Sequence, residues 1–334
     1  MKKFFITGGT GFIGSNLISE LLKNPKNKIR VVIRKKSNLS RIKKFLNKIE
    51  LIQIDFNNRK DISNALKDID TVFHLASVLG RGRKNDYINF NIKTSETIFK
   101  LAAAHNIKKV VYLSSMAVMG GTYDTIIYNE EMEPAPKNQY GKSKLAVEKI
   151  AMDIYKNKKL NITIFRPPSV YGENDNFDRG FIRVIDLIIR KKFIPVGNMN
   201  NMQSLIYIKN LINAMLLVAN EYKKSNGKIY FVSDNEILTA RETYYLIAKL
   251  GGVQPVKFHL PIKPLLYMEK FIEKTAKVLG FLPPFPENII HDLTANYACS
   301  IRKIKQDLNW EPPFSVYEGL ENTINWYKQV KNER

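Results

Sequence analysis

Thr7-Gly8-Gly9-Thr10-Gly11-Phe12-Ile13-Gly14, close to the start of this 334-residue chain, is the stretch that decides the fold. It follows an apolar run that predicts a first strand, and it opens a helical pattern. Glycines let the backbone turn tightly and approach a pyrophosphate, while the helix N-terminus offers free N–H groups and a positive dipole end. In this position a glycine triplet predicts a dinucleotide site. The residues expected to hold the dinucleotide here are Gly8, Gly11, Phe12, Ile13 and Gly14.

The first half of the chain predicts an α/β fold. Short apolar, β-branched runs alternate with helical patterns, which indicates βαβ units and a parallel sheet. The runs lack period-two alternation, as expected when both sheet faces are covered. The expected strands are Lys3–Thr7, Ile29–Ile33, Leu51–Ile54, Thr71–Leu75, Val110–Ser114 and Ile162–Phe165. The expected helices are Ile13–Leu22, Asp61–Leu66, Asn91–Ala104 and Tyr140–Tyr155.

The second half is less regular, with no repeat and no low-complexity linker. Expected helices are Phe181–Ile189, Leu211–Ala219, Pro261–Leu282, Ile301–Leu308 and Val316–Lys328, and expected strands are Leu205–Ile208 and Lys228–Val232. We predict a Rossmann-type doubly wound parallel sheet in residues 1–172, to which a strand and a helix return around 205–232. Residues 173–334 are expected to form mainly a smaller α/β substrate lobe, without a clean boundary.

Composition excludes several classes of protein. No apolar run reaches the roughly 20 residues that span a bilayer. The single cysteine, Cys299, rules out an internal disulfide framework and fits a reducing cytoplasm, where we expect the protein to work. Four scattered histidines lack ligand spacing, so we expect no metal site.

The net charge of +22 has two interpretations, a polyanionic partner or the lysine-rich composition of an A/T-rich genome. Lysines are spread along the whole chain, which favours the second. The densest basic stretch, Arg34 to Lys44, contains no aromatic residue. Nucleic-acid binding needs a concentrated basic patch with interleaved aromatics, so we expect no nucleic-acid partner.

Tyr140 and Lys144 stand four residues apart and therefore share one face of a helix. A free tyrosine has a pKa of about 10. A nearby cation favours the phenolate and lowers that pKa, so the pair can act as a proton donor and acceptor. Two exposed helix residues with no catalytic role are the alternative interpretation.

Arg34 follows the second expected strand, about 20 residues past the glycines. NAD-binding proteins usually carry an acid there, which binds the ribose 2′-hydroxyl. Arginine instead pairs with a 2′-phosphate and stacks on adenine. We therefore predict a preference for NADP(H), with NAD(H) possible. A solvated strand end is the alternative.

Several segments together resemble the extended short-chain dehydrogenase/reductases, also called the NAD-dependent epimerase/dehydratase family. They are the glycine turn, His74-Leu75-Ala76, Ser114-Ser115, Tyr140-Gly-Lys-Ser-Lys144, Arg166-Pro-Pro-Ser-Val-Tyr-Gly172, and an ending that runs through Tyr297-Ala-Cys-Ser-Ile-Arg and Leu308-Asn-Trp-Glu-Pro-Pro313 to Glu318-Gly-Leu320. The likeness covers nearly the whole chain. Within the family the chain looks nearest to the 3β-hydroxysteroid dehydrogenase and dihydroflavonol reductase-like members.

The resemblance implies roles for individual residues. Tyr140 would exchange a proton with the substrate oxygen, and Ser115 would hydrogen-bond the same oxygen. Lys144 would hold the nicotinamide ribose and lower the tyrosine pKa. Further cofactor contacts would come from Ser114, Asp55, Phe56, Leu75, Ala76, Pro167 and Ser169. A strand-end cap for Asp55 and a packed core position for His74 are the alternatives. Members of the family often have Asn at the position that Ser169 occupies here and Tyr at the position that Met119 occupies. Its members are often dimers, so we expect a homodimer.

Some members of the family carry additional catalytic residues, and their absence here reduces the number of reactions that this chain can catalyse. Dehydratases of the family carry an Asp-Glu pair where this chain has Met116-Ala117. Carbon 3,5-epimerases use a Cys/His pair, yet the one cysteine is at 299. Carbonyl/hydroxyl redox and nucleotide-sugar 4-epimerisation remain. Arg34 indicates an exchanging NADPH and so favours a reductase. A cofactor sensor or RNA-binding protein on this fold is disfavoured because serine, tyrosine and lysine are all kept.

The substrate is a small molecule of two possible kinds. Arg81, Arg83 and Arg179 are suited to hold a diphosphate, unless they are simply solvated. Where sugar-nucleotide members often have a basic residue, this chain has Met202-Gln203-Ser204. The apolar Pro261–Leu282 segment suits a roof over a sterol-like or flavonoid-like ketone. It equally suits an amphipathic helix over the core, or a membrane-surface face.

Overall fold

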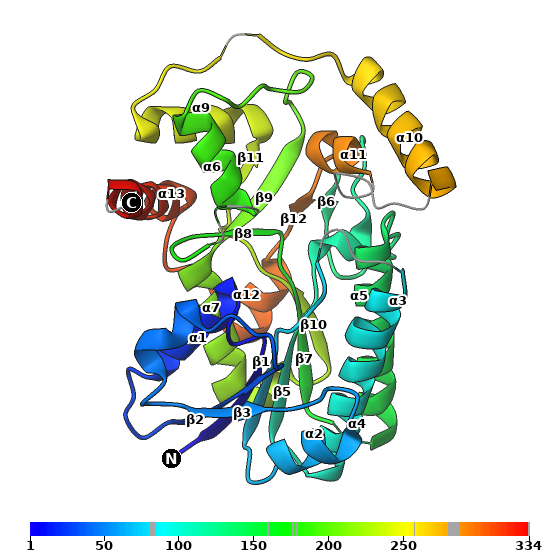
Figure 1. Cartoon of the computed structure of the whole chain (residues 1–334), viewed down its shortest axis with the longest axis vertical. Helices are drawn as coiled ribbons and strands as arrows, with labels where there is room; N and C mark the ends of the chain where they lie inside the picture. Colours follow the sequence, from blue (N-terminus) through cyan, green and yellow to red (C-terminus); the bar gives the residue numbers. More distant parts are fainter. Residues whose placement is uncertain are drawn as a thin grey trace.

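The computed structural model describes residues 1–79, 84–158, 160–175, 177, 180–256, 258–279 and 288–332. A seven-stranded parallel sheet with helices on both faces forms the lower part in Figure 1. In spatial order its strands are β10 (Lys228–Phe231), β7 (Ile162–Arg166), β5 (Lys109–Leu113), β4 (Thr71–His74), β1 (Lys3–Thr7), β2 (Lys28–Ile33) and β3 (Glu50–Gln53). The predicted Rossmann-type fold class is confirmed.

Both faces of this sheet are covered because successive residues of a strand point to opposite sides. In β1, Phe4 and Ile6 join one core cluster while Phe5 joins the other. The first face is covered by α1 (Phe12–Leu21) and α7 (Ile208–Asn220). The second is covered by α2 (Arg59–Ala65), α4 (Ser95–Ala104) and α5 (Gln139–Lys158).

The strand order reverses beside β1, which pairs with β2 on one side and with β4 on the other. In a doubly wound sheet, ligands bind at such a switch point, beyond the carboxyl ends of the strands. The glycine turn directly follows β1, so it lies at this position.

Two small sheets above that edge combine strands from before residue 172 with strands of the C-terminal half (Figure 1). One consists of β8 (Ser169–Tyr171), β9 (Met202–Tyr207) and β11 (Ile237–Thr239), and the other of β6 (Ile127–Tyr128) and β12 (Ala298–Cys299). The helices of this half are α6 (Phe181–Ile189), α8 (Tyr222–Ser225), α9 (Ala240–Gly251), α10 (Ile262–Leu279), α11 (Ile289–Thr294), α12 (Arg302–Leu308) and α13 (Val316–Asn332). The remaining short elements are η1 (Ser40–Phe45), α3 (Lys84–Asp86), η2 (Tyr87–Thr94) and η3 (Met116–Met119).

Two expectations differ from the structure in an informative way. The helix expected over Asn91–Ala104 starts inside a π-helical segment, η2, which covers residues 91–94 and runs into α4. Helix α9 was missed, although Thr239 and Glu242 form a capping box and Gly252 closes the helix in a left-handed conformation. The S/T-x-x-E pattern was readable in the sequence.

The long apolar helix expected over 261–282 is α10, and residues 280–282 lie outside the described chain. Strand β10 pairs with β7, so a segment from the second half completes the main sheet. The division of the chain at residue 172 stays a prediction. None of the helices in the described ranges is long and apolar enough to cross a bilayer.

Candidate active site

Ser115, Tyr140 and Lys144 meet at the carboxyl end of β5. Ser115 follows this strand and caps η3, because its Oγ accepts a hydrogen bond of 3.1 Å from the backbone N–H of Ala117. Tyr140 lies in the first turn of α5, and Lys144 lies one turn further along. Burial raises the pKa of Tyr140, and the neighbouring Ser115 side chain opposes this effect. The structure therefore brings together the three residues that sequence reasoning selected.

Lys144 is buried, with 3% of its surface exposed. Its Nζ donates a 2.7 Å hydrogen bond to the carbonyl oxygen of Leu113, the last residue of β5. The same Nζ lies 4.9 Å from the ring centroid of Tyr112 and 5.8 Å from that of Tyr140. The ammonium is thus fixed against the end of the central strand and beside the tyrosine ring.

The pKa of Tyr140 differs from the sequence expectation. Burial, the largest influence, raises the pKa of Tyr140 well above its ordinary value, because a low-dielectric site disfavours the phenolate. Burial also lowers the pKa of Lys144 to about 7. The sequence predicted that Lys144 lowers the pKa of Tyr140. In the structure the Lys144 ammonium is instead directed to the Leu113 carbonyl oxygen, and the effect of burial is the larger one. Tyr140 therefore carries its proton at neutral pH.

The glycine turn packs as tightly as predicted. A Cβ on Gly14 would stand 2.3 Å from the carbonyl oxygen of Gly8, and Gly8 itself has a φ of +72°. Thr7 accepts hydrogen bonds of 3.2 Å from the backbone N–H groups of Leu75 and Ala76, which ties the turn to the end of β4.

The start of α1 fits an anionic ligand. Gly11 occupies the N-cap position, and no side chain caps the helix. The first N–H groups of the helix, at Phe12 and Ile13, therefore lack the side-chain oxygen that usually satisfies them. The pyrophosphate of a dinucleotide would supply such oxygens.

Arg34 lies exposed at the end of β2, next to the glycine turn. Its guanidinium carbon is 5.0 Å from the ring centroid of Phe90 in η2, a cation–π contact that orients the side chain. Its backbone N–H donates to Ser37 Oγ at 3.0 Å. Arg34 forms no ion pair with any residue the structure describes, so the guanidinium keeps its hydrogen-bonding capacity.

Asp55 and Phe56 have local roles. The Asp55 carboxylate accepts hydrogen bonds from the backbone and side chain of Asn57, at 2.9 and 3.2 Å. Asp55 remains exposed, whereas Phe56 is 8% exposed and meets Phe90 edge-on in the core. The strand-end cap considered for Asp55 is present, and the cofactor contacts of both residues remain predictions.

His74 is a packed core residue. Its Nδ1 lies 2.7 Å from Thr7 Oγ1 and its Nε2 lies 2.8 Å from Ser95 Oγ, so both ring nitrogens are satisfied. The ring stacks on Tyr112. Burial lowers the pKa of His74 to about 3, so the imidazole is neutral. It braces the end of β4 rather than exchanging protons.

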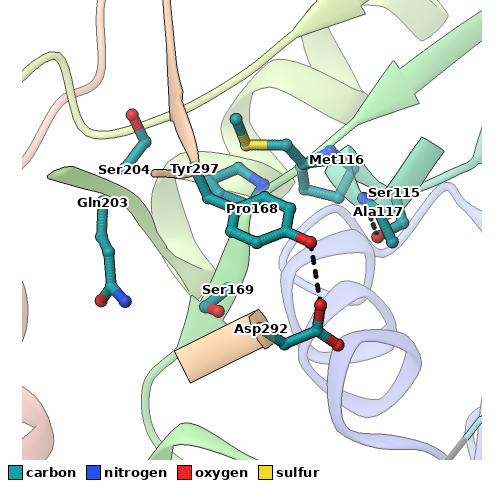
Figure 2. A pocket seen from close by; sticks show the side chains of 10 residues that line it. Ser115, Met116, Ala117, Pro168, Ser169, Gln203, Ser204, Asp292 and Tyr297 are labelled. Atoms are coloured by element: carbon teal, nitrogen blue, oxygen red, sulfur yellow. Dashed lines mark hydrogen bonds between the residues drawn. The ribbon is translucent and has the colours of Figure 1, made fainter. Parts of the chain in front are cut away.

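A pocket of about 260 Å³ opens beside Ser115 (Figure 2). Of the predicted site residues, Ser115, Pro167 and Ser169 line it. The described residues that line it are Ser115, Met116, Ala117, Pro167, Pro168, Ser169, Gln203, Ser204, Asp292 and Tyr297. Asp292 was missed because it lies in a short helix that no motif marks.

Asp292 places a carboxylate in the wall of this pocket. Figure 2 shows its side chain and that of Tyr297 directed toward each other, and the tyrosine hydroxyl donates to Asp292 Oδ1 at 2.9 Å. Asn138 donates to the other oxygen at 3.3 Å. Burial raises the pKa of Asp292. Among the lining residues that the structure describes, Asp292 is the one with a formally charged side chain, so this part of the lining offers hydroxyls and a carboxylate.

A buried ion pair supports helix α5. Arg166 Nη2 lies 2.6 Å from Glu148 Oε2, and the two side chains are 4% and 2% exposed. Ser114 Oγ donates to the other carboxylate oxygen of Glu148. Sequence reasoning assigned no role to Glu148, although it lies one turn beyond Lys144 on the same helix face.

Asn91 was also missed. Its side-chain oxygen accepts from the backbone N–H of Val78 at 2.7 Å, and its Nδ2 donates to Ser143 Oγ at 3.1 Å. It joins the segment after β4 to the helix that carries Tyr140. The predicted substrate residues Arg81, Arg83 and Arg179 lie outside the described residues.

A family model described as the NAD dependent epimerase/dehydratase family matches residues 4–233. The chain belongs to this family. The predicted resemblance and the predicted class, an enzyme, are thereby confirmed. The match covers the glycine turn, Ser115, Tyr140, Lys144 and the strands up to β10.

Individual relatives span nearly the whole chain. A UDP-glucose 4-epimerase of Vibrio cholerae is 26% identical over 99% of this chain and 97% of the relative. A 3-beta-hydroxysteroid dehydrogenase of Mycolicibacterium neoaurum is 24% identical over 99% and 92%. The structure of a UDP-glucuronic acid 4-epimerase from Bacillus cereus in complex with NAD aligns with a TM-score of 0.80 at 24% identity, covering 98% of this chain and 99% of the other. At this identity the solved structure shows the shared fold.

Proposed function

We propose that the protein is an oxidoreductase that interconverts a carbonyl and a hydroxyl group with a nicotinamide dinucleotide, Tyr140 being the acid and base. The observation that carries this proposal is the meeting of Ser115, Tyr140 and Lys144 at the carboxyl end of β5, with Ser115 in the wall of the pocket. Two hydroxyls are thus held together at the end of β5, on the same sheet edge as the glycine turn. Such a pair can bind one carbonyl oxygen.

The chain's own groups would act on that oxygen. Ser115 and Tyr140 donate hydrogen bonds to it and stabilise the negative charge that develops there. Tyr140, protonated because burial raises its pKa, then gives its proton to the oxygen. Lys144, fixed against Leu113, orients the reacting end of the cofactor. A bound nicotinamide dinucleotide would supply or accept the hydride. Because Tyr140 carries its proton in the free enzyme, it can donate that proton to a carbonyl oxygen, as carbonyl reduction requires.

The cofactor we propose is NADP(H), with weaker use of NAD(H). Arg34 is exposed and held over Phe90 at the end of β2, where a ribose 2′-phosphate would lie. Arginine recognises such a group through its rigid fork of donors. We propose in addition that the protein is a homodimer, as the family resemblance implies, and that it works in the cytoplasm, as its single cysteine suggests.

Nucleotide-sugar 4-epimerisation is the second candidate, because relatives over the whole chain include 4-epimerases. The pocket lining argues for the reductase. Within the described part of the lining, the one formal charge is the Asp292 carboxylate, which would repel a diphosphate or carboxylate group placed beside it. A neutral substrate with a carbonyl and a hydrogen-bond donor suits this lining better. The reductase therefore remains the principal proposal.

The experiment is to incubate the enzyme separately with NADPH and NADH and a panel of ketones and UDP-sugars. The nicotinamide absorbance and the products are followed together. A stoichiometric absorbance loss, faster with NADPH, supports the reductase. Product formation without net absorbance change identifies an epimerase instead. Absence of both over a broad panel, with the Tyr140→Phe variant as the blank, counts against either reaction.

A further inference from the structure

Helix α10 is fixed to the body by its inward face. The carboxylate of Glu269 accepts a 3.1 Å hydrogen bond from the backbone N–H of Ile290, and that of Glu273 accepts one of 3.3 Å from Asn288. Both acceptors therefore point to the start of α11, which lies between α10 and the body in Figure 1. Ala276 on the same face is 1% exposed. The rotation of α10 about its axis is thus set by its two acidic residues.

The N-terminal end of α10 is anchored as well. Leu260 pairs with Val196 in a bridge, and its N–H bonds to the carbonyl oxygen of Pro195 at 2.8 Å. Ile262 packs against Gly197, where an added Cβ would meet its side chain at 2.6 Å. Helix α10 is therefore held in one orientation, and a defined set of its side chains faces outward.

That outer side is apolar. Tyr267, Phe271 and Val278 are 76%, 70% and 77% exposed. Their spacing of four and seven residues aligns them in one stripe along the helix. Met268 and Leu279, 53% and 69% exposed, widen it. Exposed apolar groups gathered on one helix face indicate a contact surface rather than scattered surface residues.

A basic edge runs beside the stripe. Lys263, Lys270 and Lys274 are all exposed, and they follow one another at seven and four residues. Among the α10 side chains that the structure describes, every exposed charged group is a lysine, because both acids point inward. The outer half of the helix therefore pairs an apolar strip with a positive strip.

We propose that this outer face of α10 binds the surface of a membrane that contains anionic lipid. A helix with large apolar side chains on one strip and lysines beside it lies in the interface plane, with the apolar groups among the acyl chains and the lysines at the headgroups. Juxtaposed lysines gain from the negative surface potential of such a membrane. A second copy of this chain would bring lysines against lysines in a protein of net charge +22, which disfavours it as the occupant.

The outer face of α10 is connected to the pocket through helix α11. Helix α10 binds α11 through Glu269 and Glu273, and α11 carries Asp292 into the pocket wall. Membrane binding at α10 would hold the substrate lobe at the lipid surface. This binding is independent of which reaction the enzyme catalyses, so it can be tested without a substrate.

The test is flotation of the full-length protein with vesicles of phosphatidylcholine alone or mixed with phosphatidylglycerol. We expect the protein to float with the mixed vesicles and not with phosphatidylcholine alone. The double variant Tyr267→Ser with Phe271→Ser should lower the partition coefficient at least tenfold, since two apolar side chains no longer insert. Lys270→Gln with Lys274→Gln should lower it by about 30-fold at low salt.

Matched controls separate the α10 face from general charge and surface effects. Tyr317→Ser removes an exposed aromatic from α13, and Lys26→Gln with Lys48→Gln removes two exposed lysines elsewhere. Both should float like the wild type. Equal losses in the controls, or no flotation of the wild type, would overturn the proposal. So would a concentration-dependent dimer, seen by sedimentation, that the α10 variants abolish while vesicle binding is absent.

Discussion

Glu148 and Arg166 form a buried, two-pronged ion pair beneath the catalytic helix, with Arg166 Nε and Nη2 both donating to the carboxylate. The pair connects α5 to the end of β7, while Ser114 donates to the same carboxylate from the end of β5. Because Ser115 follows Ser114 and Lys144 lies one turn before Glu148, the pair fixes the position of α5, which carries Lys144, relative to the end of β5, which Ser115 follows.

Removing one partner of this pair should destabilise the protein strongly. Glu148→Leu or Arg166→Met leaves an uncompensated buried charge, which typically costs 3–5 kcal/mol, roughly. The double variant should be much closer to the wild type in stability, since no charge remains unpaired. Urea unfolding followed by circular dichroism measures each free energy. Single and double variants of equal stability would contradict this account.

Tyr140→Phe should lower the turnover number by roughly 10²–10⁴-fold, because the proton donor is lost. Dinucleotide binding should be unchanged, since the glycine turn is intact. Initial rates and cofactor titration by fluorescence give the two readouts. Tyr245→Phe, an exposed tyrosine on α9, is the matched control and should keep full activity. A Tyr140→Phe enzyme with unchanged turnover would remove Tyr140 from the proposed mechanism.

Arg34→Ser should weaken NADPH binding by about 10- to 100-fold, as expected for the loss of hydrogen bonds to a charged group. NADH binding should change little, because NADH lacks the 2′-phosphate. Calorimetric titration of both cofactors measures the two dissociation constants. Lys26→Ser, which removes an exposed charge elsewhere, controls for the lower net charge. Equal weakening of both cofactors would mean that Arg34 does not select between them.

Gly14→Ala should damage the dinucleotide site, because the added Cβ would stand 2.3 Å from the Gly8 carbonyl oxygen. Overpacking of this kind costs roughly 1–3 kcal/mol. Gly11→Ala is the matched comparison, since its Cβ would stand 3.2 Å from the same oxygen. We expect a lower melting temperature and weaker dinucleotide binding for Gly14→Ala than for Gly11→Ala. A lower melting temperature and weaker binding for Gly11→Ala than for Gly14→Ala would contradict the close contact between Gly14 and the Gly8 carbonyl oxygen.

Lys109 should make stability depend on pH. Burial lowers the pKa of Lys109 to about 7, against about 10.4 in an unfolded chain. Between these values the unfolded state binds the extra proton, so stability rises with pH across this window. Lys144, also lowered to about 7, adds a slope of the same sign. Below pH 7 both states are protonated and the effect levels off.

The variant Lys109→Met should therefore flatten the profile. Its unfolding free energy should rise less steeply between pH 7.5 and 9 than that of the wild type, by up to about 1.4 kcal/mol per pH unit. Urea unfolding at several pH values measures the two slopes. Lys26→Met, at an exposed position, should keep the wild-type slope. Identical slopes for Lys109→Met and wild type would contradict the buried, neutral lysine.

Much of the Rossmann half was predictable because its signals are local. The strand and helix patterns depend on neighbouring residues, and the expected strand Lys3–Thr7 matches the structure to the residue, as does the helix Phe181–Ile189 in the C-terminal half. Asp292, in contrast, lies in α11 far along the chain from Ser115, and nothing near it in sequence marks a pocket. The role of Glu148 could not be predicted either, because its partner Arg166 lies on another element.

The sequence by itself determined the family, the Rossmann sheet, the glycine turn and the choice of Ser115, Tyr140 and Lys144, since each depends on short spacings that strands and helices convert directly into geometry. Only the tertiary structure decided the protonation of Tyr140, because burial disfavours the phenolate. It also decided that Asp292 enters the pocket wall and that α10 turns its apolar stripe outward. These features depend on desolvation and on contacts between distant segments, which no local pattern records.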